Sequence, residues 1–171
     1  MIGDDWMDKL KKILKECIPY VIIIIVVVII KMTIVSPIKV NGNSMKNTLK
    51  DGDIMILNMI GYKTSKVKRF DIVVLDNEKD YIIKRVIGLP GEIIEYHDNK
   101  LYVDGKLVKD KYGNGHTNDF SVEVPKDSYF VLGDNRGDSL DSRYFGSFNK
   151  KKILGKTNFT VFPFNRFGNK K

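Results

Sequence analysis

Two segments of the chain carry side chains that could act together in bond cleavage. The first holds Ser44 between the turn-forming residues 41–43 and the apolar side chains of Met45 and Leu49. A serine hydroxyl is a weak nucleophile until a neighbouring group takes its proton. Because Gly, Asn and Ser also cluster in ordinary solvent-facing turns, this segment alone leaves both interpretations open.

Lys84 is the candidate base, in the middle of the apolar segment 81–88. In an extended strand its side chain points opposite to those of Ile83 and Arg85. A free lysine has a pKa near ~10.4, and burial lowers that pKa because the ammonium group loses its hydration. Lowering it by about 2 to 3 units costs about 3 to 4 kcal/mol and gives a base near neutral pH. The alternative is a lysine without a chemical role, alternating with isoleucine on an edge strand.

Histidine, cysteine and charge point to no further chemistry. His97 and His116 lie far apart in polar, hairpin-like sequence, and neither has a partner at metal-ligand spacing. Cys17 is the single cysteine, so no internal disulfide can form and the zinc spacings are absent. The surplus of positive charge lies in residues 149–171, which hold seven basic residues and no acidic one. This tail suits anionic lipid headgroups, and we expect no nucleic-acid partner, no metal and no cofactor.

Residues 18–35 form an apolar run that predicts a transmembrane helix. The run has about 18 residues, near the length that crosses a hydrocarbon core, and lipid forces its backbone into a helix. A cleavable signal peptide would need small residues after the run, and residues 32–37 lack an Ala-x-Ala pattern. The lysines between residues 9 and 15 place residues 1–17 in the cytoplasm and residues 36–171 outside.

The remainder of the chain predicts an all-β domain of coiled antiparallel sheets. Short β-branched and aromatic segments alternate with turn signals, and no segment shows helical periodicity. Asp104 and Gly105 form a strong type I′ hairpin signal, and residues 113–118 form a loop. The predicted strands are 38–40, 53–58, 70–75, 81–88, 92–96, 100–103, 106–108, 129–132 and 155–162.

Three segments behind the predicted anchor give the chain a family resemblance. Residues 41–49, 81–92 and 133–146, in this order and followed by Phe-Pro-Phe-Asn-Arg at 162–166, resemble the type I signal peptidases of bacteria. The resemblance implies that Ser44 is the acylating nucleophile and that Lys84 is its general base. It also implies the coiled antiparallel catalytic fold and a single N-terminal anchor.

Further residues take their expected roles from the same resemblance. Ser139 matches the serine that holds the lysine amine, and Asp141 and Arg143 match a structural ion pair beside the site. Gly42 stands where the family has an auxiliary serine, so the backbone N–H of Ser44 is left as the oxyanion donor. The apolar positions expected to line the substrate pockets are Ile38, Val40, Met45, Leu49, Met55 and Ile83.

Asn47 is the clearest departure from the family, which has proline at this position of Ser-Met-x-Pro-Thr-Leu. Proline fixes φ and loses less entropy on folding, so restoring it should add about 0.4 to 1 kcal/mol of stability. Asn also tolerates turn conformations and can cap the backbone. We therefore expect Asn47→Pro to raise thermal stability slightly and to change the rate less than about tenfold.

The resemblance implies a membrane-anchored serine endopeptidase that removes N-terminal signal peptides from exported preproteins at Ala-x-Ala-type sites. Its partners would be these signal peptides and the lipid bilayer of the plasma membrane, and we expect a monomer. Two alternatives use the same residues. One is an inactive scaffold that binds signal peptides, and the other is a self-cleaving Ser/Lys regulator. The regulator would need a DNA-binding module, where residues 1–36 hold the predicted anchor instead.

Overall fold

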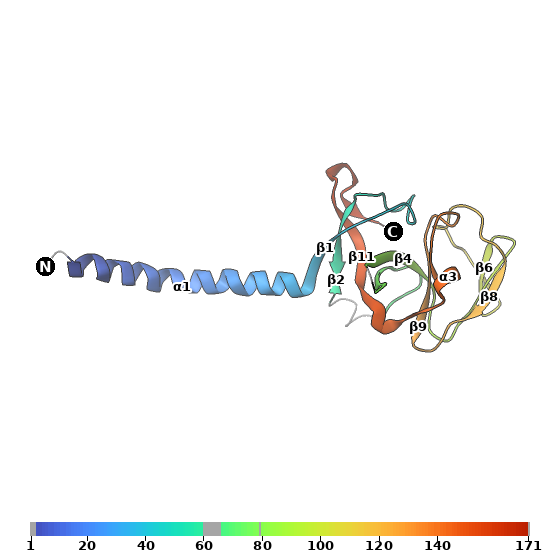
Figure 1. Ribbon diagram of the computed structural model, residues 1–171, viewed down its shortest axis with the longest axis horizontal. Coiled ribbons are helices and arrows are strands. Elements are labelled where there is room, and N and C mark those ends of the chain that lie inside the picture. The colour runs from blue at the N-terminus through green and yellow to red at the C-terminus, as the bar shows by residue number, and fades with distance from the viewer. Residues whose placement is uncertain (1–2, 60–65, 79, 171) are drawn as a thin grey trace.

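A computed structural model describes residues 3–59, 66–78 and 80–170. Helix α1 (Gly3–Ile34) extends away from the strands and continues directly into β1 (Val35–Lys39) (Figure 1). The helix is continuous through Pro19, so the predicted boundary between residues 17 and 18 is not a break in secondary structure. Across the described ranges, none of the helices is both long and apolar enough for a membrane crossing.

Eight strands form the larger sheet, and every pairing in it is antiparallel. Its path is β1–β2–β11–β3–β4–β9–β10, with β12 paired to β11. The bounds are β2 Ile54–Asn58, β3 Ile72–Asp76, β4 Tyr81–Gly88, β9 Ser128–Leu132, β10 Phe148–Asn149, β11 Ile153–Phe162 and β12 Gly168–Asn169. Strand β4 lies between β3 and β9, so placing Lys84 on an edge strand would be wrong.

Four strands form the smaller sheet, in the order β7–β6–β5–β8. They are β5 Ile93–His97, β6 Lys100–Val103, β7 Lys106–Val108 and β8 Phe120–Glu123. Asp104 and Gly105 have φ angles of 49° and 73°, which confirms the two-residue turn predicted between β6 and β7. Strand β8 was not predicted, although its four residues alternate between apolar and polar. The two-residue strands β10 and β12 of the larger sheet were not predicted either.

The core covers both faces of strand β3. Successive residues of β3 point into two different apolar clusters. Ile72 and Val74 belong to one cluster, and Val73 and Leu75 belong to the other. A third cluster fills the space between β9 and the smaller sheet, around Phe130. The continuous burial of β3 explains its unbroken apolar sequence and gives the neighbouring β4 a rigid support.

Three short helices were not predicted, since each is only three or four residues long. They are α3 (Ser142–Phe145), η1 (Lys150–Lys152) and η2 (Phe164–Arg166). Asp141 caps the first of them by accepting a hydrogen bond from the Arg143 N–H. This cap fixes the chain direction within the third sequence segment that carries the resemblance.

Candidate active site

Ser44 and Lys84 meet in the structure although forty residues separate them. The Lys84 Nζ donates a 2.6 Å hydrogen bond to the Ser44 Oγ. Ser44 lies in the turns that follow β1 and is half-buried, whereas Lys84 comes from the interior strand β4 and is 4 % exposed. A buried amine in direct contact with a reachable hydroxyl is the geometry that lets a base activate a nucleophile.

Burial lowers the pKa of Lys84 to about 8, because the ammonium form loses its hydration. The negative charges of Asp141 and Asp134 oppose this decrease, and the positive charge of Arg143 adds to it. An appreciable fraction of the amine is therefore neutral near physiological pH, and only the neutral amine can accept a proton.

The backbone around Ser44 is held by the segment that follows β9. The Asn135 N–H donates to the Ser44 carbonyl oxygen at 2.9 Å, and the Asn135 amide donates to the Asn43 carbonyl at 3.2 Å. Gly133 allows this approach, since a Cβ there would lie 2.5 Å from the Ser44 carbonyl oxygen and 2.2 Å from the Ser139 hydroxyl. No larger residue fits at Gly133 without moving Ser44 or Ser139.

Arg85, the residue after Lys84, forms a buried ion pair that the sequence did not predict. Its Nε and Nη2 donate to the two carboxylate oxygens of Asp134 at 2.8 and 2.7 Å, and both side chains are almost fully buried. Thr48 donates to the same carboxylate at 2.5 Å. This bidentate pair joins β4 to both segments around Ser44, so it fixes Ser44 relative to Lys84.

A second buried arginine joins the smaller sheet to the same segment. Arg136 donates to the Gly133 carbonyl at 3.0 Å and also contacts Tyr96 of β5 and the Asp110 carboxylate. Its backbone N–H donates to the Asn114 carbonyl at 2.8 Å. The loop predicted at residues 113–118 is thereby attached to the active-site segment rather than lying free of it.

Asp141 and Arg143 form the ion pair that the resemblance implies. Arg143 Nε and Nη2 donate to the two Asp141 oxygens, each at 2.9 Å. Burial would raise the pKa of Asp141, but hydrogen bonds from Arg143 and from the Gly133 N–H outweigh it and hold that pKa below its usual value. Ser139 is buried beside this carboxylate, yet within the described residues its hydroxyl has no hydrogen bond of standard geometry, to Lys84 or any other group.

The backbone conformation at Asn47 shows that the stabilisation predicted for Asn47→Pro is wrong. Asn47 has φ of 97° and occupies the turn closed by a 3.1 Å hydrogen bond from the Thr48 N–H to the Met45 carbonyl. Proline is confined to φ near −65° and cannot adopt this turn. Asn47→Pro should therefore destabilise the loop that carries Ser44. Gly42 also has a positive φ, of 84°, which favours glycine over the family's serine.

A small cavity of about 50 Å³ opens beside Ser44 and Lys84. Three of the six predicted pocket residues, Val40, Met45 and Ile83, line it. The other three, Ile38, Leu49 and Met55, do not line the cavity. They are buried in the same apolar cluster as the three lining residues. The lining also includes Asn41, Tyr81 and Ile82, which had not been singled out.

The two histidines lie apart from this site. His97 is exposed at the end of β5, and its Nδ1 lies 2.8 Å from an Asp119 carboxylate oxygen. Together with Asp98, these side chains place three possible metal-ligand atoms within 4.8 Å of one another. All three side chains are exposed. The ion pairing itself accounts for their approach, and nothing connects them with Ser44.

The match to known proteins decides the family. Residues 13–162 match the model of the family described as signal peptidase, peptidase S26. The chain belongs to this family. Signal peptidase IB of Staphylococcus aureus (strain COL) is 38% identical over 92% of this chain and 93% of the relative. Signal peptidase I of Bacillus amyloliquefaciens is 40% identical over 85% of each chain.

A solved relative supports the fold as well. The crystal structure of a signal peptidase I from Enterococcus faecalis is 36% identical, with a TM-score of 0.50, and the match covers 54% of this chain and 97% of that chain. These similarities identify a bacterial type I signal peptidase family member and hence a hydrolase that cleaves peptide bonds.

Proposed function

We propose that this peptidase is a membrane-anchored serine endopeptidase that removes signal peptides from exported preproteins, with Ser44 as nucleophile and Lys84 as general base. The observation that carries the proposal is the 2.6 Å hydrogen bond between the two side chains, one of them a buried lysine with a pKa of about 8. Among the residues described here neither His97 nor His116 hydrogen-bonds to Ser44 or Lys84, and both histidines are exposed.

Acylation begins when the neutral Lys84 amine takes the proton of the Ser44 hydroxyl. The Ser44 oxygen attacks the carbonyl carbon before the scissile bond, and the carbonyl oxygen becomes an oxyanion that the Ser44 N–H stabilises. Lys84 then gives its proton to the departing amine, which becomes the new N-terminus of the mature protein. An ester between Ser44 and the signal peptide remains.

Deacylation repeats the same proton transfers with water. Lys84 accepts a proton from water, the hydroxide attacks the ester, and the proton returns to the Ser44 oxygen as the bond breaks. The products are a signal peptide with a free carboxylate and the regenerated enzyme. The Asp141 carboxylate and the Arg143 guanidinium act on the pKa of the amine in opposite directions, and Ser139 lies next to Gly133.

Substrate selection follows from the size of the cavity at Ser44. A cavity of about 50 Å³ favours a small side chain such as that of alanine over an aromatic one. This supports cleavage after an Ala-x-Ala-type site. The apolar lining from Val40, Met45 and Ile83 gives such a side chain a matching surface.

The anchor proposal assigns residues 18–35 to the plasma membrane, residues 1–17 to the cytoplasm and residues 36–171 to the extracytoplasmic side. Along α1 the large apolar side chains from Ile18 to Val28 are between 46% and 69% exposed. Lipid would remove this apolar surface from water. An anchored enzyme would also meet membrane-bound preproteins at a raised effective concentration.

The test uses the full chain purified in detergent with a preprotein, followed by mapping of the cut site. We expect cleavage after a small residue by the wild type and none by Ser44→Ala. Lys84→Arg should be equally inactive, because arginine keeps the charge but cannot act as a base near neutral pH. Binding without cleavage by the wild type would instead favour an inactive scaffold, and cleavage only of the chain itself would favour a self-cleaving regulator.

A further inference from the structure

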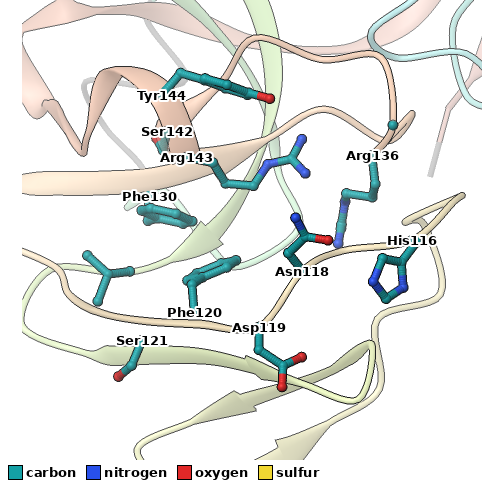
Figure 2. A pocket seen from close by; sticks show the side chains of 12 residues that line it. His116, Asn118, Asp119, Phe120, Ser121, Phe130, Arg136, Ser142, Arg143 and Tyr144 are labelled. Carbon is teal, nitrogen blue, oxygen red and sulfur yellow. The ribbon is translucent and has the colours of Figure 1, made fainter.

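A second cavity, of about 540 Å³, has no role in the steps above. It lies between the start of β8 in the smaller sheet and the segment that runs from Arg136 to α3 (Figure 2). Figure 2 shows Arg136, Arg143 and Asn118 around one side of this space, with Phe120 and Phe130 around the other. The cavity thus combines hydrogen-bond donors with an aromatic wall.

We propose that this cavity binds the substrate segment that follows the scissile bond, and that it favours an acidic side chain at the second or third residue of the mature protein. This inference rests on the proposed function, since it concerns the same substrate. It adds a site for the part of the preprotein that the small cavity at Ser44 cannot hold.

Its position follows from the chain that fixes Ser44. Asn135 binds the Ser44 carbonyl at 2.9 Å, and Arg136 and Gly137, the next two residues, already line the larger cavity. Two residues of chain span at most about 7 Å. An extended peptide advances about 3.3 Å per residue, so the second or third residue beyond the cleaved bond reaches the cavity. The cavity at Ser44, about 50 Å³ in volume, has room only for the side chain before that bond.

The preference for an acidic side chain follows from the donors that face the cavity. Arg143 binds Asp141 through Nε and Nη2, whereas its Nη1 has no hydrogen-bond partner among the described residues. The carboxylate of Asp119 is directed away from Arg143 in Figure 2, and it binds His97 at 2.8 Å. A substrate carboxylate can therefore accept from Arg143, while a substrate ammonium would meet a like charge.

Asn118 offers a variant that tests this site without touching the catalytic groups. It is exposed and lines the cavity together with Arg143. Asn118→Asp changes the side chain little in size but adds a negative charge in front of the guanidinium. The matched control is Asn165→Asp, which adds the same charge on η2, an element that packs against β11 rather than the cavity.

The experiment measures kcat/KM of the full-length enzyme in detergent for three preproteins that differ only in the second and third mature residues, which are Asp, Asn or Lys. For the wild type and Asn165→Asp we expect the Asp substrate to exceed the Lys substrate by about tenfold. For Asn118→Asp the ratio should fall to about twofold or reverse. The change should appear mainly in KM, since the cavity contacts no reacting atom.

Two results would overturn the inference. Equal cleavage of the three substrates by the wild type would leave the proposed peptidase function intact and exclude the binding site. The same would follow if Asn118→Asp and Asn165→Asp altered the Asp-to-Lys ratio equally, because the preference would then come from overall charge. If no substrate were cleaved at all, the proposed function and the site that depends on it would both fail.

Discussion

Replacing Lys84 by methionine should make the protein more stable while abolishing its proposed activity. The pKa of Lys84 falls from 10.5 to about 8 on folding because the ammonium is desolvated. At about 1.36 kcal/mol per unit, the charged form destabilises the folded state by about 3 kcal/mol relative to the neutral form. Methionine has a similar length and no charge, and losing the hydrogen bond to Ser44 offsets about 1 kcal/mol. Lys84→Met should therefore gain about 2 kcal/mol at about pH 7.

The pH dependence of this gain separates desolvation from a general packing effect. Since the folded pKa is the lower one, the unfolded chain binds more protons between about pH 8 and 10.5, and the stability of the wild type rises with pH in that window. The advantage of Lys84→Met should shrink by about 2 kcal/mol between about pH 7 and pH 9.5. Urea unfolding of both proteins at several pH values measures the difference between their free energies of unfolding. The other titrating groups are the same in both proteins, so their contributions cancel in this difference.

The rate provides a second measurement of the same pKa. About one tenth of Lys84 is neutral one pH unit below its pKa and about nine tenths one unit above. From about pH 7 to pH 9 the value of kcat/KM should accordingly rise about tenfold. A Lys84→Met protein that is less stable than the wild type at every pH, or a rate that stays flat over this range, would refute a buried amine as the base.

The remaining predictions concern backbone positions around Ser44. Asn47→Pro should lower the urea midpoint and the cleavage rate because φ of 97° is closed to proline, whereas Asn47→Gly should keep both near wild type; equal values for the two variants would contradict this. Gly42→Ser has open space for its side chain but needs φ of 84°, so it should cost about 1 kcal/mol in thermal unfolding without raising the rate. Gly133→Ala should reduce kcat more than about 100-fold by displacing Ser44, and a rate near wild type would show that the segment can move.

Much of the fold and the central pair of the site could be predicted from sequence, because they depend on local patterns. Alternating apolar segments indicated most of the strands, and the Asp104–Gly105 turn was specified by residues that accept positive φ. Ser44 and Lys84 could be named because each lies in a recognisable segment. Nothing local marks which buried arginine pairs with which aspartate, so the partnership of Arg85 with Asp134 was not predictable.

The Asn47 turn shows a different limit of prediction. A residue's type restricts φ without determining it, and asparagine is compatible with both the proline-like and the left-handed turn. In the structure Asn47 has a φ of 97°, so it adopts the second. The pocket residues show a third limit, since apolar side chains that pack as core and those that line a cavity have the same sequence pattern.

The place of β11 in the larger sheet bears on the order in which the chain folds. This strand lies between β2 and β3, far from both in the sequence, and joins the half of the sheet next to Ser44 to the half that carries Lys84. Arg166, close to the C-terminus, also binds Asp53 across 113 residues. Contacts between distant parts of a chain form late, because closing long loops costs entropy. The two halves of the larger sheet would therefore align late in folding, so a change that weakens β11 should slow the recovery of activity after refolding more than it slows the formation of the smaller sheet.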